Sequence, residues 1–148
     1  MKLILIDPSQ YDLSQNSCTV REFYKAYNHP INRQADNLSV EDASKFVESV
    51  LLRAIPLSAI LCKGFKEERF VVTNGIVWFN AIADYMEDKF ALKAKYLTAL
   101  DGKKFSEISR MYQRRIEETS VSVKFMQYGD EDHMNMLFDF IDHYARLQ

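Results

Sequence analysis

The stretch Val71-Val72-Thr73-Asn74-Gly75-Ile76-Val77-Trp78 places a strand, a turn and a helix in direct succession. Its β-branched start is typical of a buried strand, and residues 76–86 carry apolar side chains at helical spacing. Gly75 stands between the two, where the chain must turn. Because the first N–H groups of a helix have no intrahelical partner, many domains hold phosphate at such a junction. The sequence therefore predicts a strand-turn-helix unit at the centre of the fold.

Capping and periodicity predict the other elements. Thr19 with Glu22 forms a capping-box pattern, and Ser39 with Asp42 marks a second helix start. Asp101-Gly102 predicts a turn. The predicted strands are 3–6, 59–62, 69–73 and 119–128, and the further helices are 40–51, 76–86, 105–118 and one that Asp130 caps. This order predicts an α+β single domain over residues 1–148, with a short-stranded mixed sheet and several packed helices.

Length and composition narrow the class of protein. The chain has 148 residues, 47% of them hydrophobic, and no apolar run approaches the ~18 residues of a membrane span. Its apolar start is too short for a signal peptide, so we expect a cytoplasmic protein without a membrane partner. Cys18 and Cys62 lack the spacing of a metal or redox pair, and His29, His133 and His143 lack that of a zinc protease. We expect neither a metal nor a cofactor.

The net charge of −2 conceals a local excess of positive charge. Residues 89–115 contain eight lysines and arginines against two acids, which is a local charge of +6, whereas the C-terminal end is acidic. Tyr96, Phe105 and Tyr112 are interleaved with the basic residues. Cations beside aromatic rings are what single-stranded nucleic acid requires, because the cations follow the backbone while bases stack on the rings. The alternative is a solvated basic face whose aromatics belong to the core.

Several motifs occur together in the order of a known family. Residues 47–57 resemble the pattern Ile-Glu-Ser-Ile-Leu followed by Ile-Pro-Ile-Pro, and residues 90–105 match Phe-x-Leu followed by Leu-x-Gly-x-x-Phe. Residues 137–142 stand where the family has Phe-x-x-Ile-Asn. With the junction at Gly75, the chain resembles the ParB/sulfiredoxin-like superfamily over residues 19–142. It is most similar to the N-terminal domain of GmrSD-type modification-dependent restriction systems. The resemblance implies a ParB/sulfiredoxin-like fold.

The chain departs from this family where the family handles nucleotides. There the junction has Val-Val-Asp-Gly-Gln-Gln-Arg, and an upstream Gln-Arg pair precedes a tryptophan. Here Asn74 replaces the acid, Gly75 persists, Trp78 stands at the arginine position, and Arg33-Gln34 reverses the upstream pair. Asparagine cannot act as a base at neutral pH, and an indole offers packing or stacking where a guanidinium would clasp phosphate. We therefore predict a degenerate motif without catalytic residues.

The leading hypothesis is a non-enzymatic nucleic-acid-binding protein, with single-stranded DNA favoured, that acts as an accessory or regulator in replication, transcription or defence. The predicted phosphate contacts and stacking residues are Lys93, Lys95, Tyr96, Lys103, Lys104, Arg110, Tyr112, Arg114 and Arg115. One alternative is a protein-interaction module or decoy that inhibits a related full-length system. A second is residual nucleotide binding without turnover, through the N–H groups after Gly75.

Overall fold

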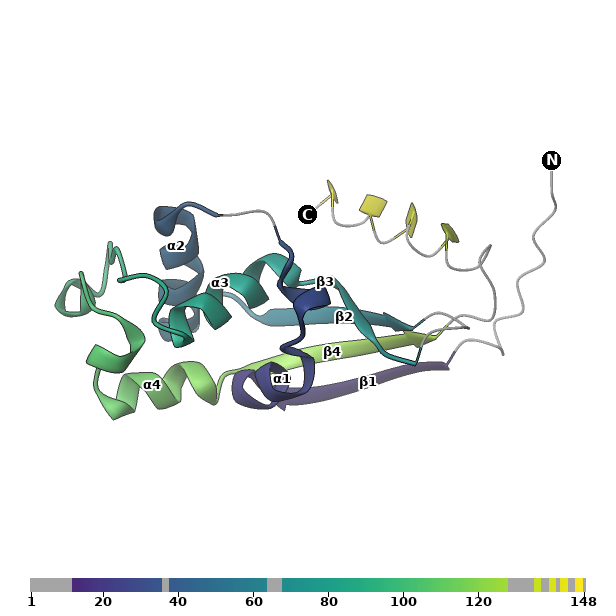
Figure 1. Cartoon of the computed structure of the whole chain (residues 1–148), viewed down its shortest axis with the longest axis horizontal. Helices are drawn as coiled ribbons and strands as arrows, with labels where there is room; N and C mark the ends of the chain where they lie inside the picture. The colour runs from purple at the N-terminus through teal and green to yellow at the C-terminus, as the bar shows by residue number, and fades with distance from the viewer. Residues whose placement is uncertain are drawn as a thin grey trace.

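A four-stranded sheet with helices gathered towards one of its ends makes up the described part of the chain (Figure 1). The computed structural model describes residues 12–35, 38–63 and 68–127, and the pairs 135–136, 139–140, 142–143 and 146–147. The strands are β1 (Asp12–Thr19), β2 (Leu57–Lys63), β3 (Val71–Asn74) and β4 (Ser120–Gln127). The α-helices are α1 (Val20–Tyr27), α2 (Val40–Leu51), α3 (Ile76–Met86) and α4 (Arg110–Glu117), with 3₁₀ turns η2 (Pro30–Arg33), η3 (Thr98–Leu100) and η4 (Phe105–Glu107).

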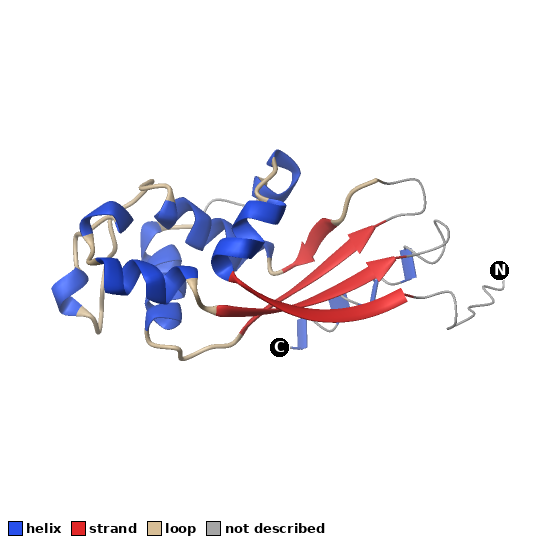
Figure 2. Cartoon of the chain, turned by 90° about the horizontal axis from the view of Figure 1, so that it is seen from below, coloured by secondary structure: helices blue, strands red, loops and turns tan. Residues whose placement is uncertain are grey.

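The sheet is mixed, with strand order β1-β4-β2-β3. The outer pairs β1/β4 and β2/β3 are antiparallel, and the central strands β2 and β4 are parallel (Figure 2). A mixed sheet with packed helices confirms the predicted α+β class. Strand β1 was not predicted, because its polar sequence has neither the apolar alternation nor the β-branched content of a strand. It forms by pairing along all of β4. The predicted strand 3–6 lies outside the described residues.

The two faces of the sheet differ in polarity. On one face β2 and β4 bury alternate residues, including Leu57, Ala59, Val121 and Val123, against the helices. On the other face Ser17, Ser58 and Ser122 lie in one cross-strand row and are exposed. The core therefore lies between one face of the sheet and the helices.

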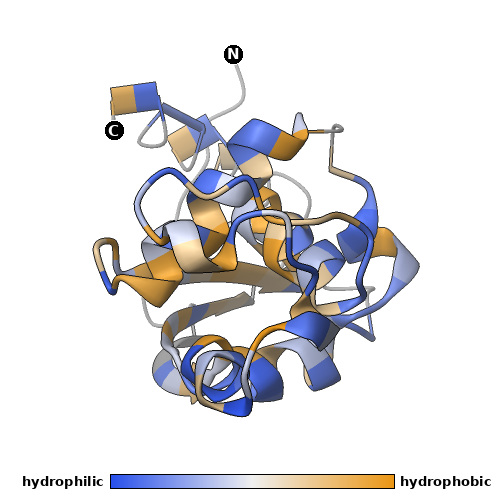
Figure 3. Ribbon diagram, turned by 90° about the vertical axis from the view of Figure 1, so that its left-hand side faces the viewer, coloured by the Kyte–Doolittle hydropathy of each residue, from blue (hydrophilic) through white to orange (hydrophobic). Residues whose placement is uncertain are grey.

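Aromatic side chains from α1 and α3 fill much of that core. Phe23 packs against Trp78 and Phe79 with ring centroids 5.4 and 5.0 Å apart. Tyr85 is fully buried and donates its hydroxyl hydrogen to the carbonyl of Lys103 at 3.0 Å. Figure 3 views the helical end and shows hydrophilic and hydrophobic residues alternating along the helices around this core. Helix α3 has the predicted bounds, residues 76–86, because its apolar residues fit this buried position.

The predicted helix 105–118 was wrong in its first half. Residues 105–107 form η4, Ile108 is extended (φ −84°, ψ 158°), and α4 begins only after Ser109. The break places Ile108 in the core, where it is 5% exposed. Carboxylates hold the preceding turn, since Glu107 accepts from the N–H of Lys104 and Asp88 accepts from that of Ser106, both at 2.9 Å.

Two further sequence predictions concern local structure. The turn at Asp101-Gly102 is confirmed, and Gly102 has the positive φ (+77°) that such a turn requires. Most of the helix predicted after Asp130 lies outside the described residues, and the four described C-terminal pairs are helical.

Candidate nucleic-acid interface

The junction at Gly75 is a closely packed connection. Gly75 precedes α3 with φ +97°, and a Cβ there would lie 2.7 Å from Nε1 of Trp78 and 2.8 Å from the carbonyl oxygen of Ser58. The indole is 8% exposed, and its Nε1 donates to that carbonyl at 2.9 Å. Asn74 is half-buried at the end of β3 and pairs with Ile60. Trp78 therefore fills the space beside Gly75 as a core residue.

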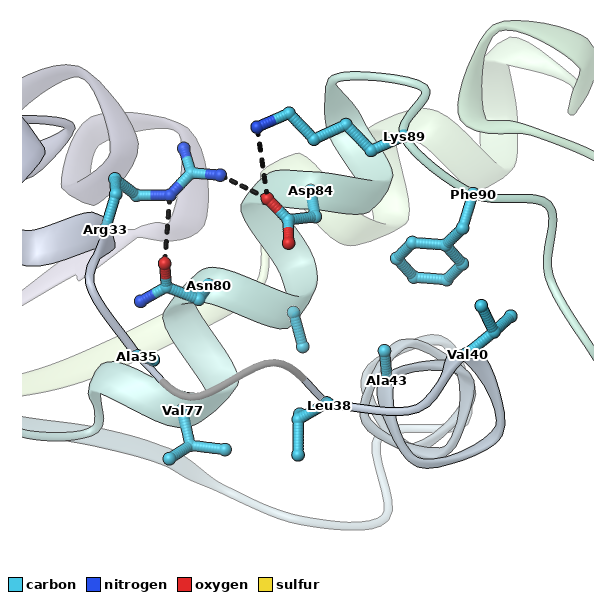
Figure 4. Close-up of a pocket in the computed structure, with 11 residues that line it drawn as sticks. Arg33, Ala35, Leu38, Val40, Ala43, Val77, Asn80, Asp84, Lys89 and Phe90 are labelled. Atoms are coloured by element: carbon cyan, nitrogen blue, oxygen red, sulfur yellow. Dashed lines mark hydrogen bonds and ion pairs between the residues drawn. The ribbon is translucent and has the colours of Figure 1, made fainter.

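The structure places Arg33, the cation of the degenerate motif, against helix α3 (Figure 4). Its Nε donates to Oδ1 of Asn80 at 3.1 Å, and its Nη2 forms ion pairs with Asp84 and, at 2.8 Å, with Glu87. Hydrogen bonding from Arg33 lowers the pKa of Glu87 to about 2. Gln34, by contrast, is exposed. The motif arginine is thus held by carboxylates of α3 and of its C-cap residue, Glu87.

A pocket of about 230 Å³ lies beside Arg33 (Figure 4). Apolar side chains of α2 and α3, among them Val40 and Val77, form one part of its lining, and Arg33, Asp84 and Lys89 form the other. Lys89 pairs with Asp84 at 3.5 Å and with Glu87 at 3.4 Å. The two cations of the lining are therefore paired with Asp84 in the lining and with Glu87 outside it, which leaves little positive charge for a phosphate.

The predicted basic residues separate into two groups, of which the first forms an open groove along α4. The groove has a volume of about 440 Å³, and we call it the arginine groove; its lining is Arg53, Arg110, Met111, Arg114, Arg115 and Glu118. Arg53 follows α2 in the sequence and adopts a positive φ of 52°. It lies outside the basic segment 89–115, so only the fold places it here. Four arginines in this lining face one glutamate.

Two of these arginines interact with other groups of the protein. Arg115 Nε donates to the main-chain carbonyl of Leu51 at 2.6 Å, at the C-terminal end of α2, where the helix dipole favours a cation. Arg110 lies 3.4 Å from the carboxylate of Glu117. Arg114 is exposed and lies between them on the same helix. The arginine groove therefore combines anchored and exposed guanidinium groups.

The second group surrounds a pocket between α2 and the loop 93–96. We call it the lysine pocket. It has a volume of about 400 Å³, and its lining is Glu41, Lys45, Glu48, Ser49, Leu52, Ala54, Lys93, Lys95 and Tyr96. Lys93 lies 3.8 Å from Glu41, and the ammonium of Lys95 lies 5.4 Å from the ring centroid of Tyr96. Tyr96 is 69% exposed. Lys45 was not predicted, because it lies on α2, far from the basic segment in the sequence.

Glu48 fixes the loop that carries these residues. It is 5% exposed, and its carboxylate accepts from the backbone N–H groups of Lys95 at 3.1 Å and of Tyr96 and Leu97 at 2.8 Å. Burial alone would raise the pKa of Glu48, but these hydrogen bonds lower it below its ordinary value. Glu48 was not predicted as a site residue, and the available signal was a carboxylate within the apolar face of a helix. It holds Tyr96 on a fixed backbone.

The remaining predicted residues lie outside both linings. Lys103 and Lys104 are exposed. The main-chain carbonyl of Lys103 accepts a hydrogen bond from the N–H of Leu92 at 2.9 Å. These lysines therefore lie next to the segment that carries Lys93. Tyr112 is half-buried and packs against the core, which leaves less of its ring for stacking than Tyr96 exposes.

Both linings include residues that directly follow α2. Leu52 and Ala54 line the lysine pocket, whereas Arg53 between them lines the arginine groove. Consecutive residues of this segment thus contribute to both sites.

Comparisons with protein-family models, with curated proteins and with solved structures gave no match. The likeness to ParB/sulfiredoxin-like domains therefore stays a prediction from the sequence. No helix within the described ranges is long and apolar enough to cross a membrane.

Proposed function

We propose that this protein is a non-enzymatic nucleic-acid-binding protein, an accessory or regulator in replication, transcription or defence, with single-stranded DNA as its favoured ligand. The arginine groove is the observation that carries the proposal. Its lining gathers Arg53, Arg110, Arg114 and Arg115 around one open depression with Glu118, while Glu117 lies 3.4 Å from Arg110. A chain of net charge −2 thus concentrates positive charge at one place.

Arginine is well suited to phosphate. Its planar guanidinium donates two parallel hydrogen bonds to phosphate oxygens and keeps its charge at any physiological pH. Such contacts supply most of the affinity of non-specific nucleic-acid binding. Arg115 is already held by the carbonyl of Leu51, so part of its side-chain entropy is lost before a ligand binds. The groove is therefore preorganised for a polyanion.

The absence of catalysis is also a proposal, supported by the degenerate motif. Asn74 lacks the charge of the family's acid, and Trp78 fills the space beside Gly75. Arg33 is paired with Asp84 and Glu87 rather than directed at a ligand. These contacts favour nucleic-acid binding at the arginine groove and the lysine pocket over a chemical reaction at the junction.

Fluorescence anisotropy with a labelled single strand, and with its duplex, tests the proposal at about 50 and 200 mM salt. We expect binding at the lower salt and a marked loss at the higher one. Arg114→Glu should weaken binding and flatten its salt dependence by about one unit of slope or more, because a phosphate contact is lost. Lys124→Glu is the matched control, since Lys124 is exposed on the opposite face of the sheet. Absence of binding to either form at low salt would refute the proposal.

A protein-interaction module is the second candidate, and one observation favours it. A groove of about 560 Å³ borders the arginine groove through Arg53 and Glu118 and is lined by Ile55, Pro56 and Leu57 among others. Ile55 is 56% exposed, as an anchor for an apolar side chain of a partner would be. This function would be favoured if the unmodified protein retains a stoichiometric protein partner that the Ile55→Asp variant loses, and if the unmodified protein shows no affinity for nucleic acid.

A further inference from the structure

We infer that the lysine pocket is a nucleobase-binding site, in which Tyr96 stacks on one unpaired base of the strand whose phosphates lie in the arginine groove. The inference rests on the proposed function and assigns single strands as its ligand. Bases of a duplex are stacked and paired, so only a single strand presents a free base face to a protein ring.

Tyr96 combines exposure with a fixed backbone. Its side chain is 69% exposed, while its N–H and those of Lys95 and Leu97 are bound by the buried carboxylate of Glu48. An exposed aromatic side chain on a mobile loop would lose entropy when it stacks on a ligand. Here three hydrogen bonds from one helix residue have already ordered the backbone. The backbone that carries the ring is therefore preorganised.

The pocket beside the ring suits a flat, partly apolar group. Leu52, which is 44% exposed, and Ala54 supply apolar contacts, and Lys45, Lys93 and Lys95 supply cations. Lys45 and Lys93 form exposed ion pairs at 3.8 Å with Asp42 and Glu41, and the carboxylate of Glu48 is bound to the loop. Its volume of about 400 Å³ lies in the range of about 300–1,000 Å³ that small-molecule sites occupy. A nucleobase joined to its phosphate needs this combination of an apolar face and a cationic rim.

The position of the pocket connects it to the arginine groove. Leu52, Arg53 and Ala54 are consecutive, and they line the two sites alternately. Three residues span at most about 10 Å, so a short strand can reach both sites. A phosphate beside Arg53 would thus leave a neighbouring base next to Tyr96.

An oligothymidine and an abasic deoxyribose-phosphate strand of the same length separate base contacts from phosphate contacts. We expect the unmodified protein to bind oligothymidine more tightly than the abasic strand. Tyr96→Ala should lower the affinity for oligothymidine about 5- to 150-fold and leave the affinity for the abasic strand unchanged, as expected for the loss of one stacked base. Tyr96→Phe, which keeps the ring, should retain the preference. Far-ultraviolet circular dichroism checks that both variants are folded.

The outcomes distinguish this inference from the proposed function. Equal affinity of the unmodified protein for the two strands, or an equal loss for both strands in Tyr96→Ala, would overturn the base pocket while phosphate binding stands. Failure to bind either strand at low salt would refute the proposed function and the base pocket with it.

Discussion

Arg115 donates from Nε to the main-chain carbonyl oxygen of Leu51 at 2.6 Å and thereby ties α4 to the C-terminal end of α2. The bond joins two residues that are 64 positions apart in the sequence, and Arg115 itself lines the arginine groove. Arg114, the preceding residue, is exposed on the same helix. Two adjacent arginines of the basic segment 89–115 therefore have different physical roles.

Substitution of these two arginines should separate stability from binding. Arg115→Ala should lower the free energy of unfolding by about 1 kcal/mol, because a charge-assisted hydrogen bond is lost at a partly exposed position, and should also weaken nucleic-acid binding. Arg114→Ala should weaken binding with little change in stability. Urea unfolding and anisotropy on the same samples measure both quantities. Equal destabilisation by the two substitutions would contradict the assigned roles.

Glu48→Gln should loosen the loop that carries Tyr96. A neutral amide has one oxygen acceptor where the carboxylate has two, so the N–H groups of Lys95, Tyr96 and Leu97 would compete for it. We expect a loss of about 1–3 kcal/mol in unfolding free energy and faster hydrogen exchange at these three amides. Glu41→Gln, at an exposed position on the same helix, is the control. Unchanged exchange at residues 95–97 would show that Glu48 does not order the loop.

The carboxylate of Glu87 should make stability depend on pH in the acidic range. Hydrogen bonding from Arg33 lowers its pKa from 4.5 to about 2 in the folded protein. A carboxyl group with a depressed folded pKa contributes stability that is present above pH 4.5 and is lost as the pH falls towards 2. Glu87→Gln should therefore reduce the fall in unfolding free energy between these two pH values. An equally steep fall in the variant, measured by urea unfolding at several pH values, would count against the Arg33–Glu87 pair.

Trp78 should act through packing. Trp78→Ala should cost about 3–5 kcal/mol, because a buried aromatic ring is removed. Trp78→Phe should cost less, since it keeps a ring beside Phe23 but leaves the carbonyl of Ser58 without the Nε1 donor. Nucleic-acid affinity per folded molecule should stay unchanged in both. A specific loss of affinity in the well-folded Phe variant would assign the indole to binding.

Asn74→Asp restores the acid of the family motif and should not produce hydrolysis, because Ile76, Val77 and Trp78 remain where the family has its amides and arginine. Phosphate release from nucleoside triphosphates measures this directly, and we expect none from either protein. Turnover by the unmodified protein that Asn74→Ala abolishes would reverse the proposal that the junction is inactive.

Local sequence determined the helix starts that depend on residues close by in the sequence. Thr19 and Glu22 form the predicted capping box, with both backbone-to-side-chain hydrogen bonds at 3.1 Å, and Ser39 caps α2 through the N–H of Asp42. Helix α3 begins directly after Gly75 as predicted. These contacts join residues three or four positions apart, so a short window of sequence contains all the information they require.

Tertiary structure decided the features that depend on distant residues. The polar strand β1 exists because β4 provides its hydrogen-bonding partner along its whole length, and Ile108 interrupts the predicted helix because the core accepts its side chain. Arg33 is held by Asp84 and Glu87, which are 51 and 54 residues away. Arg53 joins the arginine groove, and Lys45 the lysine pocket, only through packing of α2 against the rest of the chain. The sequence alone predicted an excess of charge, but its separation into two grooves follows from long-range contacts that no local pattern encodes.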